Sequence, residues 1–246
     1  MLVNARPAVV YSHMATDPSS AVPVPAAPIP PAPIPLAPIP AAAATASPTA
    51  YEPRSGWWRN AVLYQVYVRS FCDSNGDGLG DLGGVRLSLS YLTELGVDGI
   101  WLNPHYRSPQ HDHGYDVSDH CAVEPVYGTL SDFEQLVEAA HRVGLRVLVD
   151  LVANHCSVEH PRFREALAGG RGCESRELFI FRDGGGEHGE LPPNNWRSLF
   201  GGPAWHRITE PDGRPGQWYL HLYAPEQPDW NLRNPAVQEY FEHVLR

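Results

Sequence analysis

The sequence contains no lysine, and all 18 of its basic residues are arginine. Aspartate and glutamate together number 28, so the formal net charge is −10 at pH 7. An acidic chain is poorly suited to nucleic acid or to an anionic membrane surface, and we expect neither as a partner. No apolar run approaches about 18 residues, the length that a transmembrane helix needs. The composition therefore favours a small neutral ligand.

Cysteine is also scarce. The four cysteines, Cys72, Cys121, Cys156 and Cys173, include no Cys-x-x-Cys pair, which argues against a zinc site or a redox dithiol. The four cysteines could form two disulfides in a secreted protein. The favoured interpretation is that they are reduced, partly buried thiols in a cytosolic enzyme.

The first 55 residues have low sequence complexity, and 12 of the 25 prolines fall within the first 50. Proline fixes φ and removes a backbone donor, so residues 1–55 are expected to be an extended, disordered Pro/Ala-rich tail. Arg6 and Pro7 interrupt the first apolar run. The start therefore does not resemble a secretory signal, and a cytoplasmic location is expected.

From residue 56 onward, apolar runs of strand length alternate with helical periodicity. Strands are expected at Ala61–Val68, Val97–Leu102 and Leu145–Val152. The last run is almost continuously apolar, as buried parallel strands are. This β-α-β-α-β order, over residues 56–155, predicts a parallel α/β fold.

Two helices separate these strands. The first has Val85, Leu89, Leu92 and Leu95 at helical spacing and is expected to end at Gly96. The second has its apolar residues at Phe133, Leu136, Val137 and Ala140. Ser131 and Glu134 are expected to form its capping box, and Gly144 to close it.

The alternation stops after the third strand. Residues 156–228 are rich in Gly, Pro, Asn and Trp, and such a length predicts an inserted subdomain rather than a simple loop. Residues 229–246 then contain a helix start, with Asn234 as N-cap and Pro235 at the first helical position.

One loop has the composition of a cation site. Oxygen-bearing side chains alternate with glycines from Asp73 to Asp81, a pattern that can wrap Ca²⁺ or Mg²⁺. Loop position 12 is Gly84 rather than glutamate, so the loop is not an EF-hand. A polar turn without metal is the alternative.

Polar residues also follow two of the strands. The third strand ends in Asp150-Leu-Val-Ala-Asn154-His155, and the second leads to His111-Asp112-His113-Gly114-Tyr115-Asp116. In a parallel barrel, such positions face the mouth of the active site. Two histidines at i, i+2 are a weak zinc signal, whereas tyrosine beside a carboxylate suits a sugar.

Taken in order, these pieces resemble the α-amylase family of glycoside hydrolases, family 13, and within it the bacterial α-glucosidases and oligo-1,6-glucosidases. The matching phrases run from Trp57 to Arg246 and include Tyr64-Gln65-Val66-Tyr67, the Asp73–Asp81 loop, Gly114-Tyr115-Asp116-Val117, Asp150–His155, Pro193-Asn194-Asn195-Trp196 and Gln227-Pro228-Asp229. Here Trp230 and Leu232 stand where the family has Leu and Trp, and Cys156 stands where it has Thr.

The resemblance implies the first three βα units of a (β/α)₈ TIM barrel, with an inserted domain B at 156–228 and the start of barrel helix 3 at 229–246. It implies an α-glucosidase that acts on the non-reducing end of α-glucosides by a retaining mechanism, with no organic cofactor. Asp112 would bind sugar hydroxyls, Tyr115 would stack, His155 would donate a hydrogen bond and Gln227 would lie nearby. Asp150 and Asn154 would support the site. The structural Ca²⁺ or Mg²⁺ would be held by Asp73, Asn75, Asp77, Asp81 and the carbonyl of Leu79.

The family's nucleophile and acid are expected beyond Arg246, so no catalytic carboxylate is assigned in this chain, and the chain alone is expected to be inactive. A transglycosylase or a trehalose- or isomaltulose-forming isomerase of the same family is an alternative. A non-catalytic amylase-like interaction protein is another. A plain metal-binding module would leave the ordered sugar motifs unexplained.

Overall fold

The computed structural model describes residues 56–246, and the predicted tail at 1–55 lies outside the described residues. The chain begins with a short 3₁₀ helix, η1 (Trp57–Arg59), and enters a parallel sheet of β1 (Leu63–Val66), β2 (Gly99–Leu102) and β5 (Arg146–Val149). The strands lie in the order β1-β2-β5, with Tyr64 beside Ile100 and Ile100 beside Val147.

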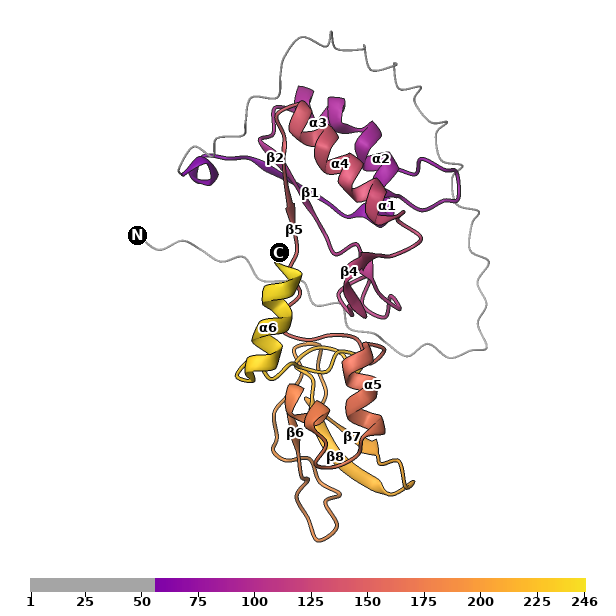
Figure 1. Ribbon diagram of the computed structural model, residues 1–246, viewed down its shortest axis with the longest axis vertical. Helices are drawn as coiled ribbons and strands as arrows, with labels where there is room; N and C mark the ends of the chain where they lie inside the picture. The colour runs from indigo at the N-terminus through magenta and orange to yellow at the C-terminus, as the bar shows by residue number, and fades with distance from the viewer. Residues whose placement is uncertain (1–55) are drawn as a thin grey trace, which may run out of the picture. The chain divides into compact units, whose positions relative to one another are not determined.

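Helices cover one face of this sheet. They are α2 (Leu82–Leu87), α3 (Leu89–Leu95) and α4 (Leu130–Arg142), and Figure 1 shows them beside the three strands. Val66, Ile100 and Leu102 of the strands are fully buried in one apolar cluster with Leu92 and Leu136 of the helices. Alternate strand residues such as Trp101 face the other way and are partly exposed. Alternation along a strand is what places the cluster on one face.

The first strand is shorter than predicted. Pairing runs only from Leu63 to Val66, because β2 offers four residues as partners, and the predicted end at Val68 instead begins the short helix α1 (Val68–Phe71). The other two strands are likewise confined to the four residues that find partners.

The predicted helix from Val85 to Leu95 is interrupted. Ser88 separates α2 from α3, with φ −92° and ψ 3°, and its hydroxyl donates to the carbonyl of Gly84 at 2.9 Å. A serine that bonds back to the preceding turn competes with the helical ladder and bends it. The predicted end at Gly96 is confirmed, with φ 83°.

The predicted capping box of α4 was placed two residues too late. Thr129 is the N-cap; its hydroxyl accepts from the backbone N–H of Asp132, and the Asp132 carboxylate accepts from the N–H of Thr129. Ser131 and Glu134 therefore lie inside the helix. The third helical residue, whose side chain accepts from the N-cap N–H, is aspartate here, and a search for Glu or Gln at that position overlooks it.

A hairpin of β3 (Tyr106–Arg107) and β4 (Asp119–Val123) follows β2 and frames residues 108–118. After β5 come α5 (Pro161–Ala168), the 3₁₀ helix η2 (Glu174–Leu178) and an antiparallel sheet ordered β6-β8-β7. Its strands are β6 (Phe181–Arg182), β7 (Trp205–Thr209) and β8 (Pro215–Leu220). The last helix is α6 (Pro235–Val244), with the predicted Asn234 cap confirmed by a 2.9 Å bond to the N–H of Ala236.

The region after β5 has an aromatic core of its own. Phe163 of α5, Phe179, Tyr219 of β8 and Trp230 are buried together, and Phe241 of α6 packs into the same cluster. Phe179 stacks on Trp230 with ring centres 4.5 Å apart. The α6 helix is thus held by the core of the region that follows β5.

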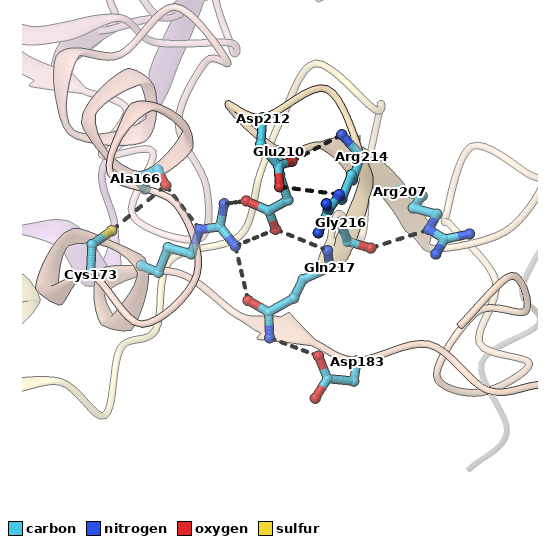
Figure 2. A network of polar contacts seen from close by, with 10 residues as sticks. Ala166, Cys173, Asp183, Arg207, Glu210, Asp212, Arg214, Gly216 and Gln217 are labelled. Carbon is cyan, nitrogen blue, oxygen red and sulfur yellow. Dashed lines mark hydrogen bonds and ion pairs between the residues drawn. The ribbon is translucent and has the colours of Figure 1, made fainter. Parts of the chain in front are cut away.

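A buried arginine ties the elements of this region together. Arg176 donates to the carbonyl of Ala166, to both carboxylate oxygens of Glu210 and to the side chain of Gln217, all within 3.0 Å. Figure 2 shows the network reaching from Ala166 across Glu210 and Gln217 to Asp183. It joins α5 to the β7–β8 hairpin.

All four cysteines have free thiols. Within the described part of the chain, no helix has the length and apolar character needed to cross a membrane.

Candidate substrate site

A cavity of about 500 Å³ opens where β2 and β5 end. Trp101 of β2 and Asp150, the residue after β5, form one side of it. Asp112 and Tyr115 reach it from the loop between β3 and β4. The remaining lining residues are Leu151, Val152, Ala153, Asn154, His155, Phe200 and Tyr223. Five of the six predicted site and supporting residues therefore line one cavity.

The sixth, Gln227, is fully buried and lies directly behind this lining. Its Nε2 donates to Oδ2 of Asp112 at 2.8 Å and lies 3.1 Å from Nε2 of His155, while its Oε1 accepts from the N–H of Ala224. Gln227 is separated by 115 residues from Asp112 and by 72 from His155. The structure thus joins residues that the sequence could associate only through resemblance.

Asp150 organises the other side of the cavity. Its carboxylate accepts from the indole N–H of Trp101 at 2.6 Å and from the hydroxyl of Tyr115 at 2.9 Å. Asn103 also donates to the Tyr115 hydroxyl at 2.9 Å. Burial and the Asp150 carboxylate raise the pKa of Tyr115 to about 12, so this hydroxyl remains a neutral donor near pH 7. Asp150 is half-buried, and Tyr115 and Trp101 supply the donors that its carboxylate needs where water is excluded.

His155 is held neutral. It is 5% exposed, and burial lowers its pKa to about 4. Its Nε2 lies 3.2 Å from the carbonyl of Tyr115, and its Nδ1 lies 3.3 Å from the side-chain nitrogen of Asn154. A neutral ring with one donor and one acceptor suits the recognition of hydroxyl groups.

Asp116 is a residue whose role sequence reasoning missed. It is fully buried, and its carboxylate accepts from the Ser108 hydroxyl and from the backbone N–H groups of His111 and Asp112, each near 3.0 Å. These bonds fold the loop so that Asp112 reaches the cavity. Asp116 belongs to the Gly114-Tyr115-Asp116-Val117 motif, so the sequence marked its position. The motif alone does not reveal which backbone groups its carboxylate binds.

Asp229 was also missed as a site residue. It is 3% exposed, and burial raises the pKa of its carboxyl to about 7. It lines a second cavity, of about 840 Å³, which shares Asn154 with the first. Only the tertiary structure places it next to the residues after β5.

The predicted cation loop is exposed from Asp73 to Gly78, whereas Asp81 is buried. The Asp73 carboxylate accepts from the N–H groups of Asn75, Gly76 and Gly78, which lower its pKa. The Asp81 carboxylate instead caps α2 at Gly84 and binds Ser74.

The candidate metal ligands in this loop are all oxygen atoms, and Asp73, Asn75 and Asp77 lie in one short turn. Oxygen ligands fit a hard cation. Asp81 fits less well, because both its oxygens already accept hydrogen bonds. Across residues 56–246, no three His, Cys, Asp or Glu side chains gather as a set of metal ligands. Metal binding in this loop stays a prediction.

The chain is similar to known proteins over most of its described length. The sequence profile of the alpha amylase catalytic domain matches residues 65–246. Trehalose-6-phosphate hydrolase of Escherichia coli K12 is 51% identical over 188 residues, covering 76% of this chain and 32% of the relative. An alpha-glucosidase of Pediococcus pentosaceus is 48% identical over 183 residues, covering 74% and 31%.

Solved structures give the same result. An alpha-glucosyl transfer enzyme, XgtA, superposes with a TM-score of 0.72 at 46% identity, over 77% of this chain and 34% of its own. Trehalose-6-phosphate hydrolase of Bacillus licheniformis gives 0.71 at 46% identity, over 77% and 33%. The chain spans about a third of the length of the curated relatives it matches.

The predicted parallel α/β architecture is that of the relatives' TIM-barrel catalytic domain, and these curated relatives are glycosidases. The chain belongs to the alpha-amylase catalytic domain family, glycoside hydrolase family 13.

Proposed function

We propose that the cavity at the ends of β2 and β5 binds the non-reducing glucosyl unit of an α-glucoside, as part of an α-glucosidase that works with retention. The observation that carries this proposal is the convergence of Asp112, His155 and Gln227: the amide nitrogen of Gln227 lies 2.8 Å from the Asp112 carboxylate and 3.1 Å from the neutral imidazole of His155. Asp112 and His155, which line the cavity, can exchange hydrogen bonds with adjacent hydroxyl groups of one sugar, and the buried Gln227 holds both residues from behind.

Aromatic side chains complete the fit to a sugar. Trp101, Tyr115 and Tyr223 all line the cavity, and an aromatic face packs against the apolar face of a pyranose ring. The volume of about 500 Å³ is in the range of small-molecule sites. The polar groups around these rings would then select the hydroxyl pattern.

Retaining hydrolysis needs a nucleophile and an acid whose carboxyl groups lie about 5–5.5 Å apart. We assign neither role to a residue of this cavity. Asp112 is bound to Gln227, and Asp150 is bound to Trp101 and Tyr115, so both are engaged in positioning. We therefore expect residues 1–246 alone to bind a glucoside without cleaving it.

Binding of methyl α-D-glucopyranoside to the protein of residues 1–246, measured by calorimetry, tests the proposal. Asp112→Ala should weaken binding about tenfold or more, because hydrogen bonds to a charged group contribute about 1.5–3 kcal/mol. Glu138→Gln, an exposed change on α4, is the matched control and should leave affinity unaltered. Equal affinity in both variants, with the fold intact, would exclude this cavity as the sugar site.

A transglycosylase or sucrose isomerase is a second candidate, since XgtA is an alpha-glucosyl transfer enzyme and a trehalulose synthase, MutB, matches at 44% identity with a TM-score of 0.71. Both reactions would use the same glucosyl pocket and differ in the acceptor. Product analysis after incubation with sucrose or maltose separates them: free glucose indicates hydrolysis, and a new disaccharide indicates transfer.

We also propose that the Asp73–Asp81 loop holds a structural Ca²⁺ or Mg²⁺ ion. Asp73, Asn75, Asp77 and the carbonyl of Leu79 would be its ligands, with Asp81 joining them if it releases one of its present bonds. Titration with each ion separately, compared between the wild type and Asp77→Ala, should show a loss of binding in the variant. Equal uptake by both proteins would refute this assignment.

A further inference from the structure

Asp229 lies on the side of Asn154 away from the glucosyl pocket. Its Oδ1 accepts from the side-chain nitrogen of Asn154 at 3.1 Å and from the backbone N–H of Leu222 at 3.2 Å. A single β-bridge also pairs Asp229 with His155. The carboxyl is therefore held by the Leu222 backbone and the Asn154 side chain, and the bridge fixes the backbone of Asp229 beside His155.

This contact decides which way the Asn154 amide points. The nitrogen of the amide is the donor, and it meets two acceptors, Oδ1 of Asp229 at 3.1 Å and Nδ1 of His155 at 3.3 Å. If the amide turned over, its carbonyl oxygen would face Oδ1 of Asp229, which already accepts from the N–H of Leu222 and is the acceptor oxygen of the carboxyl, so two acceptors would meet. Asp229 thus favours the orientation that presents an N–H to His155.

The orientation of Asn154 in turn places the proton on the imidazole. With Nδ1 of His155 accepting, the proton of the neutral ring must lie on Nε2. That nitrogen is 3.2 Å from the carbonyl of Tyr115, which can only accept, so the two contacts agree on one tautomer. Nε2 also lies 3.1 Å from the amide nitrogen of Gln227, which donates to Asp112 and cannot accept, so this is the one contact of the ring that an Nε2–H does not satisfy. Two of the three contacts of the ring nitrogens therefore favour the Nε2–H tautomer.

We propose that Asp229 is a positioning residue that acts through Asn154 to hold His155 in its Nε2–H tautomer, so that the imidazole is a hydrogen-bond donor in the glucosyl pocket. This inference rests on the proposed function only for the identity of the ligand. The chain of contacts Asp229–Asn154–His155 is independent of it. Burial keeps the pKa of His155 at about 4, so the ring is neutral near pH 7 and has a tautomer to be selected.

The ring nitrogens of His155 report the tautomer directly. In protein labelled with ¹⁵N-histidine, multiple-bond ¹H–¹⁵N spectra distinguish protonated from unprotonated ring nitrogens, and a His155→Gln variant identifies the signal among the 12 histidines. The wild type should show Nε2 protonated. Asp229→Ala should raise the ratio of Nδ1–H to Nε2–H about fivefold or more, the effect of one lost hydrogen bond.

Matched variants separate positioning from a structural role. Asp229→Asn keeps an Oδ1 acceptor for Asn154 and should retain the wild-type tautomer. Asp212→Ala removes an exposed carboxylate of the β7–β8 turn and should have no effect. Asn154→Ala should shift the ratio as Asp229→Ala does, and the double variant should shift it no further, because both act on the same contact.

The idea fails if wild-type His155 carries its proton on Nδ1, or if Asp229→Ala and Asn154→Ala both leave the tautomer unchanged. If Asp229→Ala does not fold, the wild-type spectrum and the Asn154→Ala and Asp229→Asn variants still decide the question. Failure of the wild type to bind methyl α-D-glucopyranoside would instead refute the proposed function, without bearing on the tautomer.

Discussion

Glu210→Gln is the change that most directly tests how the Arg176 network stabilises the region after β5. The Arg176 side chain is 3% exposed and that of Glu210 is 15% exposed, and the two meet through both carboxylate oxygens. Glutamine keeps the shape of glutamate but removes its charge and turns one acceptor into a donor. The guanidinium would then remain buried without its counterion.

Removing one partner of a buried ion pair costs about 3–5 kcal/mol, because the remaining charge is uncompensated. We expect Glu210→Gln to lower the free energy of unfolding by about 3 kcal/mol, the lower end of this range, because Arg176 still donates to Ala166 and Gln217. Replacing both partners by methionine should cost less than the sum of the single changes, because no charge is left buried.

Urea unfolding followed by near-ultraviolet circular dichroism measures these differences. The control is Asp212→Asn in the same hairpin, where Asp212 and Arg214 pair at 3.6 Å in an exposed position, and about 0–1 kcal/mol is expected. Arg176 lowers the pKa of Glu210, so the contribution of the pair is present above about pH 4.5 and is lost as pH falls through the folded-state pKa. A loss below about 1 kcal/mol for Glu210→Gln, or additivity of the two single changes, would refute this reasoning.

Three further predictions concern stability. Gly84→Ala should unfold α2 locally, because a Cβ there would lie 1.9 Å from the backbone oxygen of Cys72; normal melting of the variant would contradict the close approach. Asn234→Ala should cost about 1 kcal/mol by removing the cap of α6, measured as a shift in the urea midpoint, whereas Asn234→Asp should retain most of it. Burial lowers the pKa of His105 to about 4, so below pH 6.5 the unfolded chain binds a proton that the folded chain does not. About 3 kcal/mol of the free energy of unfolding should therefore be lost as pH falls from 6.5 to 4, and the full stability is present above pH 6.5. His105→Phe should reduce that pH dependence, and an unchanged slope would show that His105 is not its source.

Several local features were predictable because neighbours in the sequence decide them. Gly96 ends α3 through its positive φ, and Asn234 caps α6 through a bond to the backbone two residues later. Other features depended on competition between adjacent groups. Ser88 bonds back to Gly84 and breaks a helix whose apolar spacing is continuous, and Thr129 takes the cap that Ser131 was expected to supply.

The candidate site shows the same division. Asp112, Tyr115 and His155 were identified from short phrases that resemble a known family, and the structure places all three around one cavity. The contacts of Gln227 with Asp112 and His155 arise from packing across 115 and 72 residues. No local pattern contains that information.

The sequence by itself determined the alternation of strands and helices, the loop of oxygen donors and the membership of the glycosidase family, because periodicity, turn residues and ordered motifs are local properties. The tertiary structure alone decided the partners of the polar groups in the candidate site. The half-buried Asp150 binds Trp101 and Tyr115, and the buried Asp229 binds Asn154, because a carboxylate that loses contact with water on folding must take the donors that the fold brings to it. Those donors come from other strands and loops, and folding determines which of them arrive.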